Sequence, residues 1–410
     1  MLRWIIFILI FGIIDIYAYQ AFKTVSKNQW LNILYWAVSL LVIGNFVYRL
    51  YDLNRGDFGT AHAYAFGFLI ALIIPKVMLL MIMFAEDIFR VPHALYRYFT
   101  EGTVAQGSYM PSRRTFISKI ALGIAAIPFA SILYGIYRGK YNFKVLKYTL
   151  HFEDLPNAFD GYRLTQISDI HSGSFDNKEK VDYAIDLVNE QQSDVILFTG
   201  DMVNNKADEM KSYIDIFSKL NAKDGMYSVL GNHDYGDYVR WDSKEAKHQN
   251  LEDLKSIQKE IGFDLLLNEH RFIEKDGTRI AIVGVENWGA GGFKKAGDLK
   301  KAASGIQKDD FKILMSHDPS HWEKEVIQDD YHYHLTLSGH THGMQFGIEI
   351  PGWFKWSPVK WRYKYWAGIY EELGQYINVN RGFGYLAFPG RVGIWPEITV
   401  IELKKGPKTA

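Results

Sequence analysis

Five short blocks of polar residues, in a fixed order along the chain, carry the clearest chemistry in this sequence. They are Asp169-Ile170-His171, Gly200-Asp201, Gly231-Asn232-His233-Asp234, Ser316-His317 and Gly339-His340-Thr341-His342. Their carboxylate, amide and imidazole groups are donors that suit Mn, Fe, Zn or Mg. A site with this many donors can hold two ions about 3.5–4 Å apart, clamping the attacking and leaving oxygens of a phosphoester. The blocks therefore predict a metal-dependent hydrolase.

The context of the blocks matters more than any single block. Taken alone, Gly-Asp is an ordinary turn, Gly-Asn-His-Asp can cap a helix, and one histidine is usually structural. However, each block follows an apolar run, at residues 164–167, 195–198, 226–230, 313–315 and 335–337. Such runs are typical of buried strands, which would deliver the blocks to one edge of a sheet. We therefore expect the blocks to form one site.

The order D-x-H, G-D, G-N-H-D, H, G-H-x-H resembles the calcineurin-like metallophosphoesterases. Flanking segments at 160–173, 337–347 and 380–403 are similar to the bacterial membrane-associated branch of that family. The resemblance covers roughly residues 145–405 and implies a catalytic domain with a four-layer αββα sandwich fold. Alternating strand-like and helix-like segments in this region also favour α/β layering. One departure is Met344, where relatives commonly carry glycine, and it concerns the cleft wall rather than metal binding.

Ligand chemistry and the resemblance together imply a role for each candidate residue. One ion is expected on Asp169, His171 and His342. The other is expected on Asn232, His317 and His340. Asp201 is the expected bridge, because a carboxylate can offer one oxygen to each ion. Water caught between two dications loses a proton near neutral pH, and the resulting hydroxide would attack phosphorus.

Two neighbours of these ligands are candidate catalytic residues. His233 follows a ligand directly, so we expect it to protonate the leaving oxygen or to stabilise charge in the transition state. Asp234 could orient an imidazole, as carboxylates do around metal sites. A helix cap is the alternative role for Asp234.

Length and composition bound the other possibilities. A chain of 410 residues suggests two or more units. The formal net charge is +0, so no basic field argues for a nucleic-acid partner. The chain has no cysteine, which excludes disulfides and thiolate metal sites.

The first third of the chain predicts a membrane region. A spanning helix needs about 20 mostly apolar residues, and four stretches qualify, near 4–19, 30–47, 63–84 and 116–137. Aromatic residues lie near the ends of these stretches, as in an interfacial belt. We therefore expect an all-α transmembrane region over residues 1–140, joined to the following domain by a short linker around 138–141. A buried helical core is the alternative.

The side of the membrane that the domain occupies depends on one motif. Lysines and arginines divide equally between the two sides, so the positive-inside rule does not decide. Residues 112–117, Ser-Arg-Arg-Thr-Phe-Ile, resemble a twin-arginine export motif followed by an apolar segment. This pattern predicts an extracytoplasmic domain anchored in a bacterial inner or plasma membrane. An ordinary basic flank is the alternative.

Two further features call for an explanation. Asp15 and Lys76 interrupt predicted spans at similar depths, which predicts that they pair with each other. Residues 351–366 interleave aromatic and cationic side chains, including Trp353, Trp356 and Trp361. That composition suits lipid headgroups or a lipid-like substrate. It would also suit single-stranded nucleic acid or a packed aromatic hairpin.

Two classes of function remain. The first is a phosphohydrolase that cleaves a phosphoester or pyrophosphate bond, with a lipid or nucleotide-linked lipid among the candidate substrates. The second is a catalytically silent membrane scaffold or binding protein with the same fold. All seven expected ligands and His233 are present, which favours the hydrolase.

Overall fold

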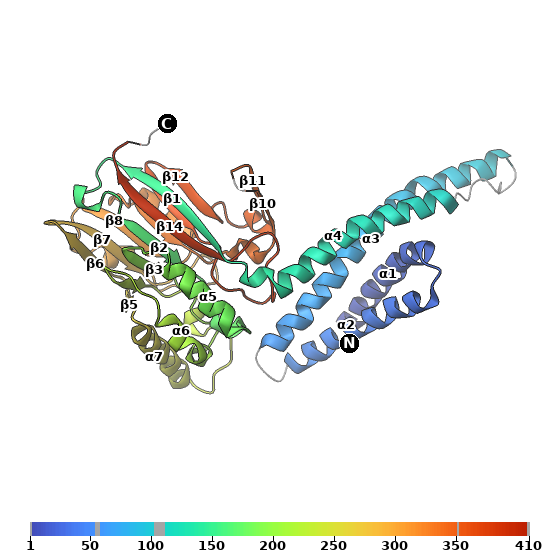
Figure 1. Cartoon of the computed structure of the whole chain (residues 1–410). Coiled ribbons are helices and arrows are strands. Elements are labelled where there is room, and N and C mark those ends of the chain that lie inside the picture. Colours follow the sequence, from blue (N-terminus) through green and yellow to red (C-terminus); the bar gives the residue numbers. More distant parts are fainter. Residues whose placement is uncertain (1, 54–57, 102–110, 351, 408–410) are drawn as a thin grey trace. The chain divides into compact units, whose positions relative to one another are not determined.

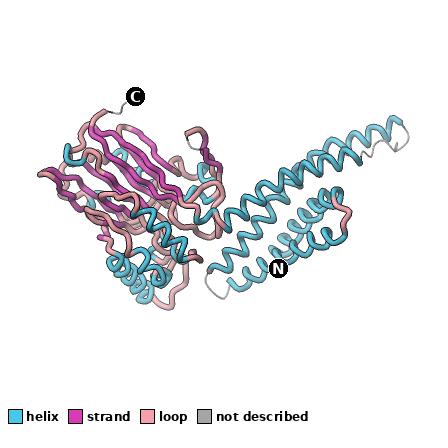
Figure 2. The backbone as a smooth tube through the Cα atoms, viewed as in Figure 1, coloured by secondary structure: helices cyan, strands magenta, loops and turns pink. Residues whose placement is uncertain are grey.

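The computed structural model describes residues 2–53, 58–101, 111–350 and 352–407. The chain divides into two compact units, which we call the helical unit (Met1–Ile136) and the sandwich unit (Tyr137–Ala410). Figures 1 and 2 show long helices in the first unit and layered strands and helices in the second.

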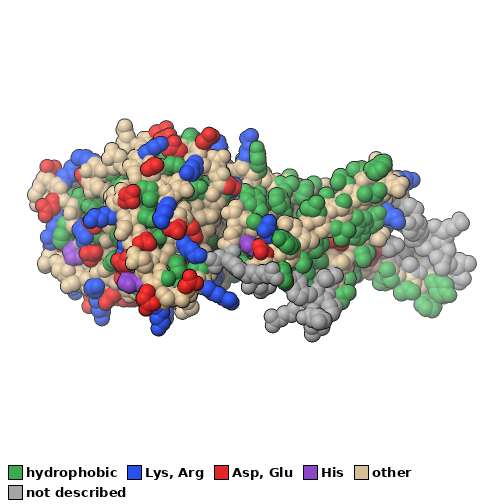
Figure 3. Space-filling view, turned by 90° about the horizontal axis from the view of Figure 1, so that it is seen from below, with side chains coloured by type: hydrophobic (Ala, Val, Ile, Leu, Met, Phe, Trp, Pro, Cys, Tyr) green, Lys and Arg blue, Asp and Glu red, His purple; other side chains and the backbone are tan. Residues whose placement is uncertain are grey.

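The helical unit contains four long helices in its described residues. They are α1 (Leu2–Val25), α2 (Gln29–Leu53), α3 (Thr60–Glu101) and α4 (Pro111–Tyr137). Three stretches, Gln29–Leu53, Thr60–Phe89 and Arg113–Tyr137, are long and apolar enough to cross a membrane. Figure 3 shows hydrophobic side chains over much of the visible surface of this unit, where lipid would replace water as the solvent. The prediction of a helical membrane region is confirmed, and the number of spans stays a prediction.

The helices of this unit pack through small residues and buried polar pairs. Ala18 and Ala21 of α1 lie in one buried cluster with Leu79 and Met83 of α3 and with Ala121 and Ala125 of α4.

The buried polar pairs include the one that the sequence predicts. The Lys76 ammonium pairs with the Asp15 carboxylate, which also accepts a hydrogen bond of 3.0 Å from Ser39 Oγ. The predicted Asp15–Lys76 pairing is therefore confirmed. Near the start of α4, the Arg114 guanidinium lies 3.0 Å from a Glu86 oxygen and 2.9 Å from an Asp87 oxygen.

The sandwich unit is built on two mixed six-stranded sheets. The first has the order β1-β14-β2-β3-β4-β5, in which β2, β3, β4 and β5 run parallel and β14 is antiparallel to β2. Its strands are β1 (Lys144–Phe152), β14 (Glu397–Lys405), β2 (Arg163–Ile167), β3 (Val195–Phe198), β4 (Met226–Ser228) and β5 (Asp264–Leu265).

The second sheet has the order β12-β13-β9-β8-β7-β6, with β13, β9, β8 and β7 parallel. Its strands are β12 (Gly368–Glu372), β13 (Gln375–Val379), β9 (Leu335–Ser338), β8 (Phe311–Ser316), β7 (Thr278–Val285) and β6 (Glu269–Lys275). A separate antiparallel hairpin joins β10 (Ile348–Ile350) and β11 (Phe354–Trp356).

Alternating side chains bind the layers together. In β3, Val195 and Leu197 face the second sheet, whereas Ile196 and Phe198 face α5 (Lys178–Asn189) and α7 (Lys244–Ile261). The outer face of the second sheet packs under α8 (Leu299–Ala302) and α9 (Ser320–Lys324), and the short α6 (Ile214–Phe217) lies with α5 and α7. The four-layer αββα sandwich is therefore confirmed.

The segment expected to link the two parts is not a free linker. Residues Gly139–Tyr141 form a 3-10 turn, and Lys140 is buried with its ammonium paired to Asp176 of the sandwich unit. Gly139 lies against the backbone of Arg391, so closely that a side chain there would clash. The ordered sandwich unit thus begins almost where α4 ends.

Candidate metal centre

The five sequence blocks meet at one edge of the sandwich. Each follows the carboxyl end of a strand, namely β2, β3, β4, β8 or β9. Five of the residues in these loops have a left-handed backbone with φ between 48° and 71°: Asp169, His171, Asp201, His340 and His342. Such a conformation is uncommon outside glycine and, when it recurs, it tends to mark functional sites. The backbone is thus strained at the positions where the ligands were expected.

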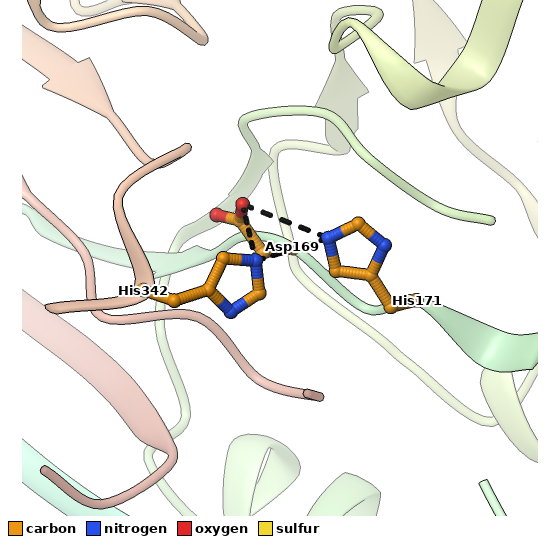
Figure 4. Close-up of side chains that lie close together, drawn as sticks. All are labelled: Asp169, His171 and His342. Carbon is orange, nitrogen blue, oxygen red and sulfur yellow. Dashed lines mark hydrogen bonds and ion pairs between the residues drawn. The ribbon is translucent and has the colours of Figure 1, made fainter. Parts of the chain in front are cut away.

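The first group of donors joins the β2 and β9 loops. In Figure 4 the ring of His171 and the ring of His342 direct nitrogens toward the Asp169 carboxylate. Nε2 of His342 lies 3.1 Å from Asp169 Oδ1, and Nε2 of His171 lies 4.0 Å from the same oxygen. The two Nε2 atoms are 3.0 Å apart. Three donors therefore converge on one point.

The second group joins the β3, β4, β8 and β9 loops. His317 Nε2 lies 3.1 Å from Asp201 Oδ2, and its Nδ1 is 2.8 Å from the Thr199 carbonyl. His340 Nδ1 lies 2.8 Å from the side-chain oxygen of Asn232. Asn232, His317 and His340, the three residues expected to hold one ion, therefore lie close together, with Asp201 beside them.

Asp201 lies between the two groups. Its Oδ2 is 3.6 Å from His171 Nε2 of the first group as well as close to His317 of the second. Its Oδ1 accepts a hydrogen bond of 2.8 Å from the backbone N–H of His233. A side chain at Gly231 would meet the Asp201 carboxylate, so only glycine allows this approach.

The arrangement fits two divalent ions. The ligand atoms of Asp169, His171 and His342 all lie within 4.8 Å of one another, and so do those of Asp201, His317 and His340. Nε2 of His317 is buried and faces Asp201 Oδ2 at 3.1 Å without hydrogen-bond geometry. Burying such polar atoms costs free energy unless another group compensates them. A shared cation would supply that compensation.

The charged groups of the site strongly shift one another's pKa values. Burial would raise the pKa of Asp201, but the charges of His317 and His233 hold it well below its ordinary value. For His317 the order is reversed: burial would lower the pKa, yet the Asp201 carboxylate raises it to about 10. Burial and the charge of His317 lower the pKa of His340 to about 4.

His233 lies beside both groups without joining either. Its Nδ1 is 2.7 Å from the Asn204 carbonyl, so that carbonyl fixes Nδ1 as the protonated nitrogen. The ring stands edge-on to His171 at 5.0 Å and lines the cleft over the metal groups. Nε2 is therefore the atom of His233 that can act on a substrate.

The hydrogen bonds of Asp234 in the described part of the chain are to backbone N–H groups and not to an imidazole. Its buried carboxylate accepts backbone N–H groups from Asp201 (2.9 Å), Met202 (2.8 Å) and Gly231 (2.9 Å). These bonds tie the β3 loop to the β4 loop. Asp234 therefore positions Asp201 through the backbone.

Three residues of the site were not anticipated from the sequence. Tyr363 OH lies 2.8 Å from His340 Nε2, and Tyr238 OH accepts a hydrogen bond of 2.8 Å from the Asn232 amide. The buried guanidinium of Arg391 lies 3.2 Å from Nδ1 of His342. Each of the three contacts the side chain of an expected ligand, as residues around metal sites do when they orient the ligands. Tyr238 lies shortly after the Gly231–Asp234 block, whereas Tyr363 and Arg391 come from loops distant in sequence and are brought here by the fold.

A cleft of about 340 Å³ opens over the two groups. Its floor includes His171, Asp201 and Asn232, and its walls include Met344 and Trp361. Met344 has a φ of 55°, a conformation that favours glycine. The expectation that this departure touches the cleft wall is confirmed.

The comparisons with known proteins agree with this site. Residues 162–344 match the family described as "Calcineurin-like phosphoesterase", and residues 2–140 match "Probable Calcineurin-like phosphoesterase, transmembrane domain". The fold and site define a metallophosphoesterase with a membrane region. The chain belongs to the calcineurin-like phosphoesterase family.

Relatives occur in bacteria and in vertebrates. The chain is 30% identical over 274 residues to the uncharacterized metallophosphoesterase YkuE of Bacillus subtilis, covering 66% of this chain and 89% of that protein. It is 29% identical over 315 residues to the transmembrane protein with metallophosphoesterase domain of Danio rerio, covering 74% of this chain and 65% of that one. Among solved structures, TT1561 of Thermus thermophilus is 13% identical with a TM-score of 0.33, covering 57% of this chain and 90% of TT1561.

Proposed function

We propose that this protein is a membrane-anchored, dinuclear-metal phosphohydrolase that cleaves a phosphoester or pyrophosphate bond. In this proposal residues 1–140 form the membrane region and residues 145–405 the catalytic domain. The single observation that supports it most is the convergence of Asp169, His171 and His342 on one point and of Asp201, His317 and His340 on a second.

The seven ligands divide as the donor geometry suggests. Asp169, His171 and His342 would hold one ion, and Asn232, His317 and His340 the other. Asp201 would bridge them, because its Oδ2 approaches an imidazole of each group. When bound, two divalent ions would activate a water near neutral pH and neutralise charge on the phosphoryl oxygens. Their identity, among Mn, Fe, Zn and Mg, is left to elemental analysis.

The chain's own residues would complete the chemistry. His233, with its Nδ1–H held by the Asn204 carbonyl, presents Nε2 to the cleft and in its doubly protonated imidazolium form would donate the Nε2 proton to the leaving oxygen. Asp234 and Tyr363 would act as positioning residues, through the Asp201 backbone and the His340 ring respectively.

A panel of phosphate esters tests the proposal. Full-length protein in detergent is stripped with a chelator, reloaded with Mn²⁺, and assayed on phosphomonoesters, phosphodiesters and pyrophosphates. Turnover of at least one class, lost on chelation and restored by metal, is expected. A protein that binds two ions per chain but turns over none of these substrates would instead be a silent scaffold.

We further propose that the sandwich unit is extracytoplasmic, in a bacterial inner or plasma membrane. The support is the twin-arginine-like segment, in which Arg113 and Arg114 begin an apolar helix. The ion pairs of Arg114 with Glu86 and Asp87 offer an alternative, purely structural role for this arginine. A reporter fused after Ala410 should be active only outside the cytoplasm, and a cytoplasmic signal would contradict the assignment.

A further inference from the structure

The β10–β11 hairpin inverts the usual polarity of a strand pair on a soluble protein. In its register, Ile348 pairs with Trp356 and Ile350 with Phe354, and cross-strand partners share one face. Ile348, Ile350 and Phe354 are exposed. An antiparallel pair in water normally turns its polar face outward.

The polar pair of the hairpin faces the protein instead. Glu349 lies opposite Lys355 in the register. The Glu349 carboxylate accepts a hydrogen bond of 3.0 Å from Arg381 Nε, and the Lys355 ammonium donates to the Ala367 carbonyl. The apolar face is therefore held outward by specific bonds on the opposite face.

The apolar face continues to the mouth of the cleft. Trp353, in the turn of the hairpin, is 80% exposed. Trp356 packs edge-on against Trp361 at 5.9 Å, and Trp361 is both 76% exposed and part of the cleft wall. Lys360 and Arg362, on either side of Trp361, are exposed cations. We call the following exposed or partly exposed side chains the hairpin face: Ile348, Ile350, Trp353, Phe354, Trp356, Lys360, Trp361 and Arg362. Figure 1 labels the two strands of the hairpin.

The chain itself indicates what covers the hairpin face. Its helical unit has three stretches long and apolar enough to cross a membrane, and their insertion would bring a bilayer close to the sandwich unit. The tether is short, because α4 ends at Tyr137 and Lys140 is already buried in the sandwich unit. Exposed tryptophans beside cations match the chemistry of an anionic bilayer surface, where rings enter the interface and cations meet phosphates.

We propose that the hairpin face docks on the bilayer in which the protein is anchored and holds the mouth of the cleft against the lipid headgroups. The docking itself does not depend on hydrolysis. Docking would favour phosphoesters that are embedded in the membrane as substrates. This consequence rests on the proposed function.

Site-specific labelling tests the docking directly. Since the chain has no cysteine, Trp353→Cys carries a single NBD fluorophore on full-length protein reconstituted in vesicles of phosphatidylcholine and phosphatidylglycerol. The control is Leu373→Cys, also an exposed apolar residue in a strand turn. It lies between β12 and β13 at the end of the sheet opposite the ligand loops, because β13 runs parallel to β9.

The two positions should behave differently. We expect doxyl-labelled lipids to quench the label at 353 and to leave the label at 373 nearly unchanged. Equal quenching at both positions would overturn the proposal. So would a blue-shifted label at 353 that the lipid quenchers do not reach, because protein and not lipid would then cover the face.

A functional arm separates docking from catalysis. The double variant Trp353→Ser/Phe354→Ser changes the hairpin face outside the cleft. It should lower activity on a vesicle-embedded phosphoester about tenfold and leave activity on a soluble nitrophenyl phosphate unchanged. Equal loss on both substrates would overturn the functional consequence. Absence of activity in the unmodified protein would refute the proposed function alone, since the quenching experiment stands without it.

Discussion

At the scale of single residues, the centre of the site is one carboxylate. Asp201 is held from three directions: its Oδ1 by the His233 backbone, its backbone by Asp234, and its Oδ2 against imidazoles of both donor groups. An oxygen fixed between two groups of ligands is suited to a shared role. Asp201 should therefore couple the two ions more strongly than any other side chain.

Asp201→Asn should reduce both metal content and turnover, because the amide removes the negative charge that the two ions would share. Elemental analysis of the purified variant and assays on the same sample are the measurements. Asp182→Asn on α5, at a partly exposed side chain, is the matched control and should change neither. A variant that kept two ions and near-normal turnover would refute the bridging role.

His233→Ala should keep its metals and lose about 10²–10⁴-fold in kcat, as expected for a missing general acid. The loss should be smaller for nitrophenyl esters, whose leaving groups need no proton, than for alkyl esters. His248→Ala, at an exposed position on α7, is the control. Equal loss on both ester types would favour charge stabilisation, and loss of metal would make His233 a ligand.

Metal binding should release protons. In the metal-free protein His317 has a pKa of about 10, so near pH 8 it is protonated, whereas His340 with a pKa of about 4 is already neutral. An imidazole must lose its proton before it can bind a metal. Titration calorimetry in buffers of different ionisation enthalpy should therefore show at least about one proton released per chain. Metal binding without proton release would show that His317 does not lose a proton to the solvent when the metal binds.

At the scale of elements, the strongest constraint in the helical unit is a polar pair. Asp15 of α1 and Lys76 of α3 are buried and paired, with Ser39 of α2 on the same carboxylate. One contact set thus joins three helices. Removing one charge would leave the other uncompensated in an apolar environment.

Lys76→Met should destabilise the full-length protein in detergent by about 3 kcal/mol, within the range for breaking a buried pair. The double variant Asp15→Asn/Lys76→Met should recover much of that loss, since no charge is left unpaired. Thermal unfolding of the single and double variants measures both. Additive losses in the double variant would show that the two residues do not stabilise each other.

Sequence patterns predicted the strands that are buried on both faces. Strands β2, β3, β8 and β9 are apolar runs covered on both faces, and their positions match the predicted runs. Strand β1 (Lys144–Phe152) lies at a sheet edge and mixes exposed with buried positions, so its pattern is weak. The bonds of Asp234 to Asp201 and Met202, and the contact of His340 with Tyr363, join loops distant in sequence, which no local pattern encodes.

The aromatic segment at residues 351–366 also shows what a sequence pattern cannot predict. Its composition predicted an interface, but composition cannot show that the Lys355 ammonium donates to a backbone carbonyl. Nor can it distinguish Trp353, which is exposed, from Trp366, which is buried against Ile394. Only the folded structure of the segment separates these roles.

At the scale of the whole molecule, all candidate ligands lie in one of the two compact units. The helical unit ends at Ile136, whereas the first ligand is Asp169. Ligand binding stabilises only the unit that contains the site. The two units should therefore respond differently to metal.

Chelation should lower the thermal transition of the sandwich unit and leave that of the helical unit in place. A free ion at about a hundredfold excess over its dissociation constant contributes about 2.7 kcal/mol to the folded state. Calorimetry of the full-length protein with and without chelator, followed by reloading, measures the shift. A single transition that moves as one would show that the units unfold together.

The short connection between the two units would also affect the kinetics of the proposed phosphohydrolase. Lys140 is packed into the sandwich unit just after α4 ends at Tyr137, so the proposed anchoring would keep that unit in the layer of space beside the membrane. A substrate dissolved in the bilayer is concentrated in that layer, whereas a soluble one is diluted over the whole compartment. Rates on lipid substrates should then follow the mole fraction of substrate in the surface rather than its bulk concentration. Adding inert lipid at constant bulk substrate would slow the reaction by two-dimensional dilution alone.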